Sequence, residues 1–261
     1  MEMVSAAKLR RVQEAVQLSK PYLERLQQML GEISGSVGHV KHPLLANRPV
    51  RKTGFLVITA DRGLAGAYNA NVIRRALQEF RNRDRAAYVV FAVGRRGRDF
   101  FLRHGYPVGG EATGLPDAPT YASVRGLAVR VVESYGAEEF DELHLIYNEF
   151  INALAQRTVM KKVLPLSGLS EAGAKRVNFL YEPDEVAVLE ALLPRYAETL
   201  VYQSVLDAKA SEHGARMAAM RNATDTAAEM IETLTLALNR ARQAAITTQI
   251  VEIVGGAEAL K

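Results

Sequence analysis

The sequence predicts an α/β fold, with a small Rossmann-like α/β sheet domain inserted between N- and C-terminal helices that form a long antiparallel coiled coil. Three observations predict this fold. Apolar residues recur at alternating spacings of three and four near both ends of the chain. The middle alternates short apolar runs with amphipathic segments, and the last part has few residues that break helices. We expect three segments: an N-terminal coiled-coil helix and linker (1–52), an α/β foot domain (53–183) and a C-terminal coiled-coil helix (184–261).

The first segment is expected to be helical from Met1 to about Glu32. Pro21 removes one backbone donor within this helix, and the glycines from Gly31 onward are expected to end it. The apolar seam, with one polar position, consists of Leu9, Val12, Val16, Ser19, Leu23, Leu26, Leu30 and Ile33. This spacing is typical of a left-handed coiled coil.

The middle segment changes period and is expected to form a sheet with helices between its strands. Glycines and prolines around 109–119 predict a loop in its middle. The expected strands are 54–60, 88–93, 142–148, 158–164 and 176–181, and the expected helices are 71–83, 95–103 and 121–135.

The last segment is expected to contain a short helix after Asp184 and then one long helix from Pro194 to about Val254. Pro194 suits a first-turn position, and the Gly255–Gly256 pair suits a stop. About 60 residues at about 1.5 Å each give roughly 90 Å, so this helix is expected to project from the sheet domain and pair antiparallel with the first helix. A long helix within an ordinary bundle is the alternative. The expected seam is Met220, Ala223, Ala227, Met230, Leu234, Leu238, Ala241 and Ala245.

The composition excludes several classes of chemistry and leaves the role of one basic stretch open. The chain has no Cys, so disulfides, thiolate nucleophiles and Cys-ligated zinc are excluded. It has neither an apolar run long enough to cross a bilayer nor the apolar core of a signal peptide, so we expect a soluble cytoplasmic chain. The net charge is only +4, but arginines concentrate between 48 and 103. That stretch indicates either a surface for nucleic acid or an acidic protein, or merely the solvated faces of helices.

The motifs that could carry chemistry do not assemble a catalytic site. The turn Asp61–Asn69 lies between an expected strand and helix, where phosphate can bind, but it lacks the spacing of known phosphate loops. A tight turn is the simpler interpretation. The histidines show no metal-ligand spacing, and no serine lies in a nucleophile elbow. We therefore predict no catalytic residue, no metal and no cofactor.

Several blocks of the sequence, in order, carry a resemblance to a known family. They are MEMVSAAKLRR at the start, TADRGLAGAYNANV at 59–72, NFLYEPD at 178–184, and RNATDTA, NRARQAAIT and EIVGGAEAL in the last segment. Over essentially its whole length the chain resembles the gamma subunit of the F-type, bacterial-like ATP synthase. That family has a further stretch of helix before MEMV, so the chain is expected to lack the start of its N-terminal helix.

The resemblance implies a non-catalytic shaft in the central stalk. Such a shaft couples rotation of the proton-driven membrane ring to conformational cycling of the catalytic subunits that make or hydrolyse ATP. The implied partners are the alpha and beta subunits, with one shaft per hexamer, the epsilon subunit and the membrane c-ring. Neither nucleic-acid binding nor direct insertion into the bilayer is implied. The implied location is peripheral, on the cytoplasmic face of the cell membrane.

The resemblance also assigns contacts residue by residue. Arg216, Arg242, Gln243 and Thr247 match positions that face the surrounding alpha and beta subunits, and Met1 matches a methionine near the stator. Tyr181 and Glu182 match positions near the polar loops of the membrane ring. Gln249 departs from the pattern, because some members carry Glu there. Two other functions stay open, namely an α/β nucleotide-binding enzyme with a helical appendage and a basic nucleic-acid-binding coiled-coil protein.

Overall fold

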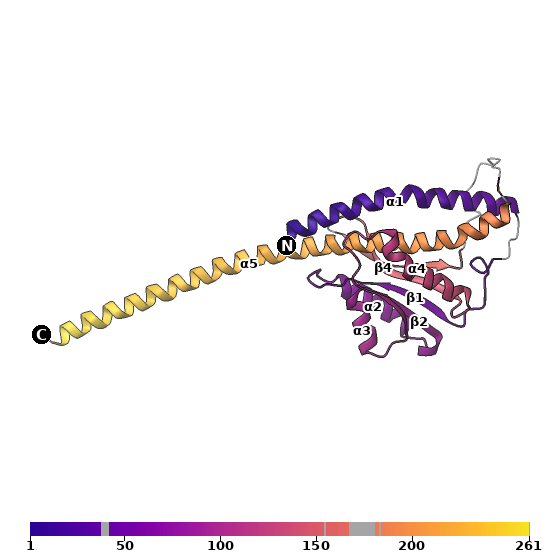
Figure 1. The fold of residues 1–261 in the computed structure, drawn as a ribbon. Coiled ribbons are helices and arrows are strands. Elements are labelled where there is room, and N and C mark those ends of the chain that lie inside the picture. The colour runs from indigo at the N-terminus through magenta and orange to yellow at the C-terminus, as the bar shows by residue number, and fades with distance from the viewer. Residues whose placement is uncertain (38–41, 154, 167–180, 183, 261) are drawn as a thin grey trace. The chain divides into compact units, whose positions relative to one another are not determined.

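The computed structural model describes residues 1–37, 42–153, 155–166, 181–182 and 184–260 (Figure 1). By internal contacts the chain divides into two units, Met1–Ala218 and Ala219–Lys261. The elements are α1 (Glu2–Val37), β1 (Thr53–Ile58), α2 (Tyr68–Phe80), η1 (Arg85–Ala87), β2 (Tyr88–Val93), α3 (Arg95–Arg103), β3 (Val108–Ala112), α4 (Tyr121–Gly136), β4 (Glu142–Phe150), β5 (Gln156–Leu164) and α5 (Glu185–Ala259). The division into three segments expected from the sequence was based on secondary-structure elements and not on internal contacts. It stays a prediction.

A five-stranded mixed sheet forms the centre of the first unit, in the order β3-β2-β1-β4-β5. β1 pairs parallel with β2 and β4, β2 pairs parallel with β3, and only β5 is antiparallel. Every residue of β1 is buried, as a central parallel strand covered on both faces requires. The sequence placed four of these strands and all three sheet helices within a few residues of their observed ends.

The strand β3 corrects the prediction of a loop around Gly109 and Gly110. Both glycines lie against the neighbouring strand β2, and a Cβ atom on Gly109 would come within 2.5 Å of Val89 Cγ2. These glycines therefore permit a close strand approach rather than a turn.

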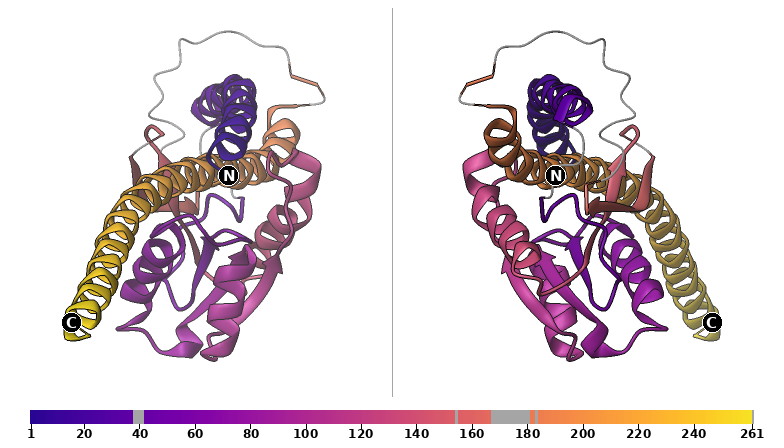
Figure 2. Two further views of the ribbon diagram at one scale, coloured as in Figure 1. Left: turned by 90° about the vertical axis from the view of Figure 1, so that its left-hand side faces the viewer. Right: turned by 90° about the vertical axis from the view of Figure 1, so that its right-hand side faces the viewer.

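Helices cover both faces of the sheet (Figure 2). On one face, α2 and α3 pack through residues such as Val72, Ala76 and Phe101. On the other face, α4, α1 and the first part of α5 share a larger core that includes Val131, Leu30 and Leu193. This two-faced covering is the arrangement that consecutive parallel strands with crossover helices produce.

The predicted antiparallel pairing of the terminal helices is confirmed within the first unit. Leu9 and Val12, near the start of α1, share a small core with Ala210 of α5. The Ser19 hydroxyl donates a 2.7 Å hydrogen bond to Gln203 Oε1, which satisfies the one polar position of the predicted seam. The other end of α1 packs in the core that contains Leu193, so the two helices run in opposite directions (Figure 1).

The limits of the terminal helices differ from those predicted. α5 is one helix from Glu185 to Ala259, with Pro194 in its interior and Gly255 and Gly256 in its last turns. The predicted start at Pro194 and the predicted stop are therefore wrong. α1 continues to Val37, beyond the predicted end. The strand predicted at 176–181 lies outside the described residues except for Tyr181, which is in no strand.

The second unit consists of the later part of α5. Its residues 221–257 are exposed throughout. The predicted seam from Met220 to Ala245 falls almost entirely in this unit, whereas the α5 residues that share cores with α1 lie between Leu189 and Ala210.

Candidate functional site

The turn after β1 is closed by its own side chains. Asp61 Oδ1 accepts hydrogen bonds of 3.0 Å from the backbone amides of Arg95 and Gly114. Asn69 Oδ1 accepts a 2.8 Å hydrogen bond from the amide of Ala60. A carboxylate at the start of α3 thus takes an amide that a bound phosphate would need. The geometry favours the tight-turn interpretation over phosphate binding.

The glycines that follow β2 serve packing. Gly94 has φ +87°, and a Cβ atom there would lie 2.2 Å from the carbonyl oxygen of Thr59. The amide of Gly97 donates a 2.9 Å hydrogen bond to Thr59 Oγ1. Both positions therefore bring the start of α3 close to the end of β1.

A buried ionic cluster lies on α5 near the end of the first unit. Glu212 is buried and accepts hydrogen bonds from Lys209 Nζ at 3.0 Å and from Arg216 Nη2 at 2.7 Å. Arg216 also donates from Nε to the carbonyl oxygen of Gly63 at 3.3 Å. Because these residues follow at spacings of three and four, one helix face presents all three side chains. The cluster ties α5 to the turn after β1.

His213 and Asp117 extend this cluster toward α1. His213 is 1 % exposed, and its Nε2 lies 3.7 Å from Asp117 Oδ1. Burial lowers the pKa of His213, with opposing contributions from nearby charges, so the ring is neutral near pH 7. Asp117 pairs with Lys8 of α1 at 2.9 Å. Burial opposes ionisation of Asp117, but Lys8 outweighs it and lowers the pKa of that carboxyl on balance.

The predicted shaft contacts fall in different surroundings. Arg216 is half-buried in the cluster just described, whereas Arg242, Gln243 and Thr247 are exposed in the second unit. The Thr247 hydroxyl donates to the carbonyl oxygen of Gln243 at 2.9 Å, a bond within the helix. Met1 is exposed at the start of the chain, and its carbonyl oxygen accepts from Ser5. The structure does not bring these residues together into one site.

The second unit exposes many large apolar side chains along one helix. Apolar surface in this concentration marks a site of protein interaction. The exposed residues are Met230, Ile231, Leu234, Leu236, Leu238, Ile246, Ile250, Val251, Ile253 and Val254.

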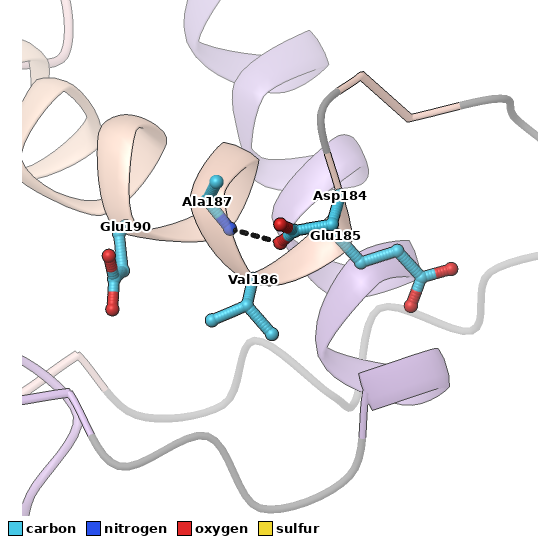
Figure 3. Close-up of a pocket in the computed structure, with 5 residues that line it drawn as sticks. All are labelled: Asp184, Glu185, Val186, Ala187 and Glu190. Atoms are coloured by element: carbon cyan, nitrogen blue, oxygen red, sulfur yellow. Dashed lines mark hydrogen bonds between the residues drawn. The ribbon is translucent and has the colours of Figure 1, made fainter.

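The residues predicted to meet the membrane ring precede α5 in the chain. Tyr181 is half-buried against the main core, and burial raises the pKa of its hydroxyl, with Glu185 and Glu32 adding to the shift. Glu182 is exposed. Asp184 caps the helix, because its Oδ1 accepts a 2.8 Å hydrogen bond from the amide of Ala187 (Figure 3).

Figure 3 shows an open, acidic hollow around this helix start. Its lining residues are Asp184, Glu185, Val186, Ala187 and Glu190.

Within the described ranges, no group of three or more His, Asp or Glu residues could hold a metal ion. Among the helices described, none combines the length and the apolar character that a membrane span requires.

Comparison with known proteins gives the chain its family. The family described as ATP synthase matches residues 1–260. The ATP synthase gamma chain of Brevibacillus brevis is 49 % identical over 99 % of this chain and 91 % of its own length. That of Pelotomaculum thermopropionicum is 49 % identical over 100 % and 92 %. This chain belongs to the ATP synthase gamma chain family. It is thus a subunit of ATP synthase.

Solved structures of ATP synthases share the fold of this gamma chain family member. A chain from the central stalk and c-ring structure of the Tetrahymena thermophila mitochondrial ATP synthase matches with a TM-score of 0.68 and 22 % identity, over 86 % of this chain and 97 % of that one. A chain from the Euglena gracilis mitochondrial ATP synthase matches with a TM-score of 0.63 and 18 % identity, over 99 % and 94 %. At these identities the likeness concerns the fold, which is that of the central stalk.

Sequence reasoning named Arg216 but missed its buried partners Glu212 and Lys209. The spacing of three and four on one helix face was available as a signal, yet such pairs are common on exposed helices. Only the burial of Glu212 distinguishes this group.

Proposed function

We propose that this chain is the rotor shaft of the central stalk of an F-type ATP synthase. In this role it couples rotation of the proton-driven membrane c-ring to conformational cycling of the catalytic subunits. The observation that carries the proposal is the later part of α5, a helix that exposes large apolar side chains over residues 230–254. A helix of this kind needs protein around it, and a ring of alpha and beta subunits supplies that environment.

The mechanism follows from asymmetry. One helical rod has no three-fold symmetry, so inside a ring of three catalytic subunits it touches each of them differently. Each orientation stabilises one set of subunit conformations over the others by differential contact. Rotation then moves that preference from one subunit to the next, and the reverse process turns the shaft when ATP is hydrolysed.

The shaft itself is proposed to be non-catalytic. Asp61 takes the amide that would bind phosphate at the start of α3, and the ionic cluster around Glu212 is saturated by its own partners. Nucleotide chemistry then belongs to the alpha and beta subunits. The same geometry weighs against the nucleotide-binding enzyme considered from the sequence.

The proposed contacts follow the residues assigned by family resemblance. Arg242, Gln243 and Thr247 are exposed and available to polar groups of the surrounding ring. Arg216, with Met1, is proposed to contact the ring where the shaft enters it. Tyr181 and Glu182 are proposed to meet the polar loops of the c-ring, with the epsilon subunit bound to the foot. As part of this complex, the chain is proposed to lie peripherally on the cytoplasmic face of the cell membrane.

Co-expression with alpha and beta subunits tests the proposal. The chain should co-purify as one copy per alpha–beta hexamer, measured by native mass spectrometry. A ratio of one chain per alpha–beta pair, or no association, would contradict it.

A further inference from the structure

The structure sorts the arginines of the basic stretch into two groups. One group is used internally. Arg48, for example, donates to the carbonyl oxygens of Tyr135 and Phe140, and Arg83 donates to Thr53 Oγ1 at 2.6 Å. The internally bonded arginines are Arg48, Arg75, Arg83, Arg85 and Arg98. These arginines already have partners within the chain. An external partner would therefore be bound by the remaining arginines of the stretch.

Three of the remaining arginines line one groove between α2 and α3. Arg74 comes from α2, and Arg96 and Arg103 come from α3; all three are exposed. Within the described part of the chain, these three side chains make a single hydrogen bond, a weak 3.3 Å contact from Arg74 Nη1 to Asn71 Oδ1 within α2. We call this hollow of about 560 Å³ the α2–α3 groove.

The floor of the α2–α3 groove is apolar. Ile73, Leu77 and Phe100 line it, and Leu77 and Phe100 pack on the core beneath α2 and α3. The single acid in the lining, Asp99, is paired with Arg98 at 2.7 Å. The groove therefore combines a firmly anchored apolar floor with an uncompensated positive rim. It lies on the face of the sheet opposite to α1 and α5.

We propose that the α2–α3 groove is a docking site for an amphipathic helix with acidic flanks, supplied by a protein partner. A helix laid into a groove between two helices buries its apolar stripe on Ile73, Leu77 and Phe100. Its carboxylates then pair with Arg74, Arg96 and Arg103, whose planar guanidinium groups suit carboxylates. The apolar floor between two helices fits this occupant in shape, and the positive rim fits it in charge.

The same geometry disfavours nucleic acid and free nucleotides. Single-stranded nucleic acid binds through open aromatic faces. The Phe100 ring instead packs against His104, with ring centroids 4.3 Å apart, and against Phe101 at 5.6 Å. The backbone amide of Arg95, at the start of α3, is bonded to Asp61 and cannot add to the binding of a phosphate there.

A peptide titration on the full chain tests the proposal. The probe is a fluorescent peptide of about 18 residues, five helical turns, with Leu along one face and Glu on the others. The wild-type chain should bind it, and Arg96→Glu combined with Arg103→Glu should weaken binding about tenfold or more. Phe100→Ala should weaken it as well. Arg125→Glu, an exposed change on α4, is the matched control and should bind like the wild type.

Three outcomes would overturn the proposal. The first is equal binding of the wild type and the Arg96/Arg103 variant, with both folded by circular dichroism. The second is equal binding of a peptide of the same composition in scrambled order, which has no apolar stripe. The third is competition by a short DNA duplex or by ATP at the concentration at which the unlabelled peptide competes. The Arg96/Arg103 variant should still enter the alpha–beta hexamer, which separates this docking site from the shaft function.

Discussion

The two parts of α5 are made from similar residue types but lie in opposite environments. In the first unit, Leu189, Leu193 and Val201 are fully buried in the core that α5 shares with α1 and the sheet. In the second unit, Leu234 and Ile250 have more than half of their surface exposed. The apolar residues of the first part therefore stabilise the fold of this chain, and those of the second part are left for partners.

The polar residues of α5 differ in the same way. In the first unit, Glu212 is bonded to Lys209 and Arg216. In the second unit, Arg242 and Gln243 are exposed. Polar groups that are bonded within the chain are thus separated along one helix from polar groups that are exposed. Mutations in the two parts are expected to act on different quantities, stability and assembly.

The largest difference is expected for an acid placed at an apolar position of each part. Leu193→Asp puts a carboxylate into the core and should lower the free energy of unfolding by at least about 4 kcal/mol. Leu234→Asp should change it by less than about 0.5 kcal/mol. Urea unfolding of the isolated chain measures both. Equal losses in the two variants would abolish the distinction between the two parts.

Removing one buried acid is expected to have the next largest effect. Glu212→Ala leaves Lys209 buried without its partner and should cost about 3 kcal/mol of unfolding free energy. Glu232→Ala, an exposed acid of the second unit, is the matched control and should be neutral within about 0.5 kcal/mol. A loss below about 1 kcal/mol for Glu212→Ala would show that the cluster does not stabilise the chain.

The half-buried carboxyl of Asp207, on α5, is expected to destabilise the folded chain when it is ionised. Burial raises the pKa of Asp207 to about 6, with Lys161 opposing and Glu149 adding to the shift. The folded chain thus holds this proton more tightly than the unfolded chain does. The stability that Asp207 contributes is present below the unfolded pKa of 3.8 and is lost as pH rises through about 6.

Asp207→Asn should therefore stabilise the chain at alkaline pH. Allowing for partial exposure of the side chain, the expected gain near pH 8 is about 1–2 kcal/mol, and it should vanish near pH 4. Urea unfolding at several pH values measures it. Asp225→Asn in the second unit serves as the control. A gain that is independent of pH would contradict the assignment to the carboxyl charge.

The smallest effect is expected at His213. Its pKa is lowered in the folded chain, so its contribution to stability is present above the unfolded pKa of 6.5 and is lost as pH falls below that value. His213→Gln should flatten this acid dependence by less than about 1 kcal/mol. Unfolding midpoints between about pH 5 and pH 7 measure it, with His104→Gln as the exposed control. An unchanged acid slope would exclude His213 as its source.

Much of the fold could be predicted because its elements have clear periods. The strand Tyr88–Val93 and the helix Arg95–Arg103 were predicted to the residue, since each is a short run with one period. The strand β3 was missed because Gly109 and Gly110 have no side chains to show alternation, although close packing on β2 requires them. The continuity of α5 was missed at Pro194, where tertiary packing of the flanking turns outweighs one lost hydrogen bond.

Less of the candidate site than of the fold could be predicted from the sequence. Family resemblance named Arg216, Arg242, Gln243 and Thr247 together, yet only the burial of Glu212 shows that Arg216 also stabilises the first unit. The α2–α3 groove could not be predicted either. Arginines bonded within the chain and arginines at the groove are interspersed along the sequence, and only the tertiary structure separates them.

Rotation of the assembled complex tests the central claim most directly. The chain has no cysteine, so Asn82→Cys, at an exposed position after α2, gives a single attachment point for a bead. With the alpha–beta hexamer fixed to a surface, the bead should turn continuously in one direction when ATP is added. A bead that stays still while the same hexamer hydrolyses ATP would contradict a rotor shaft.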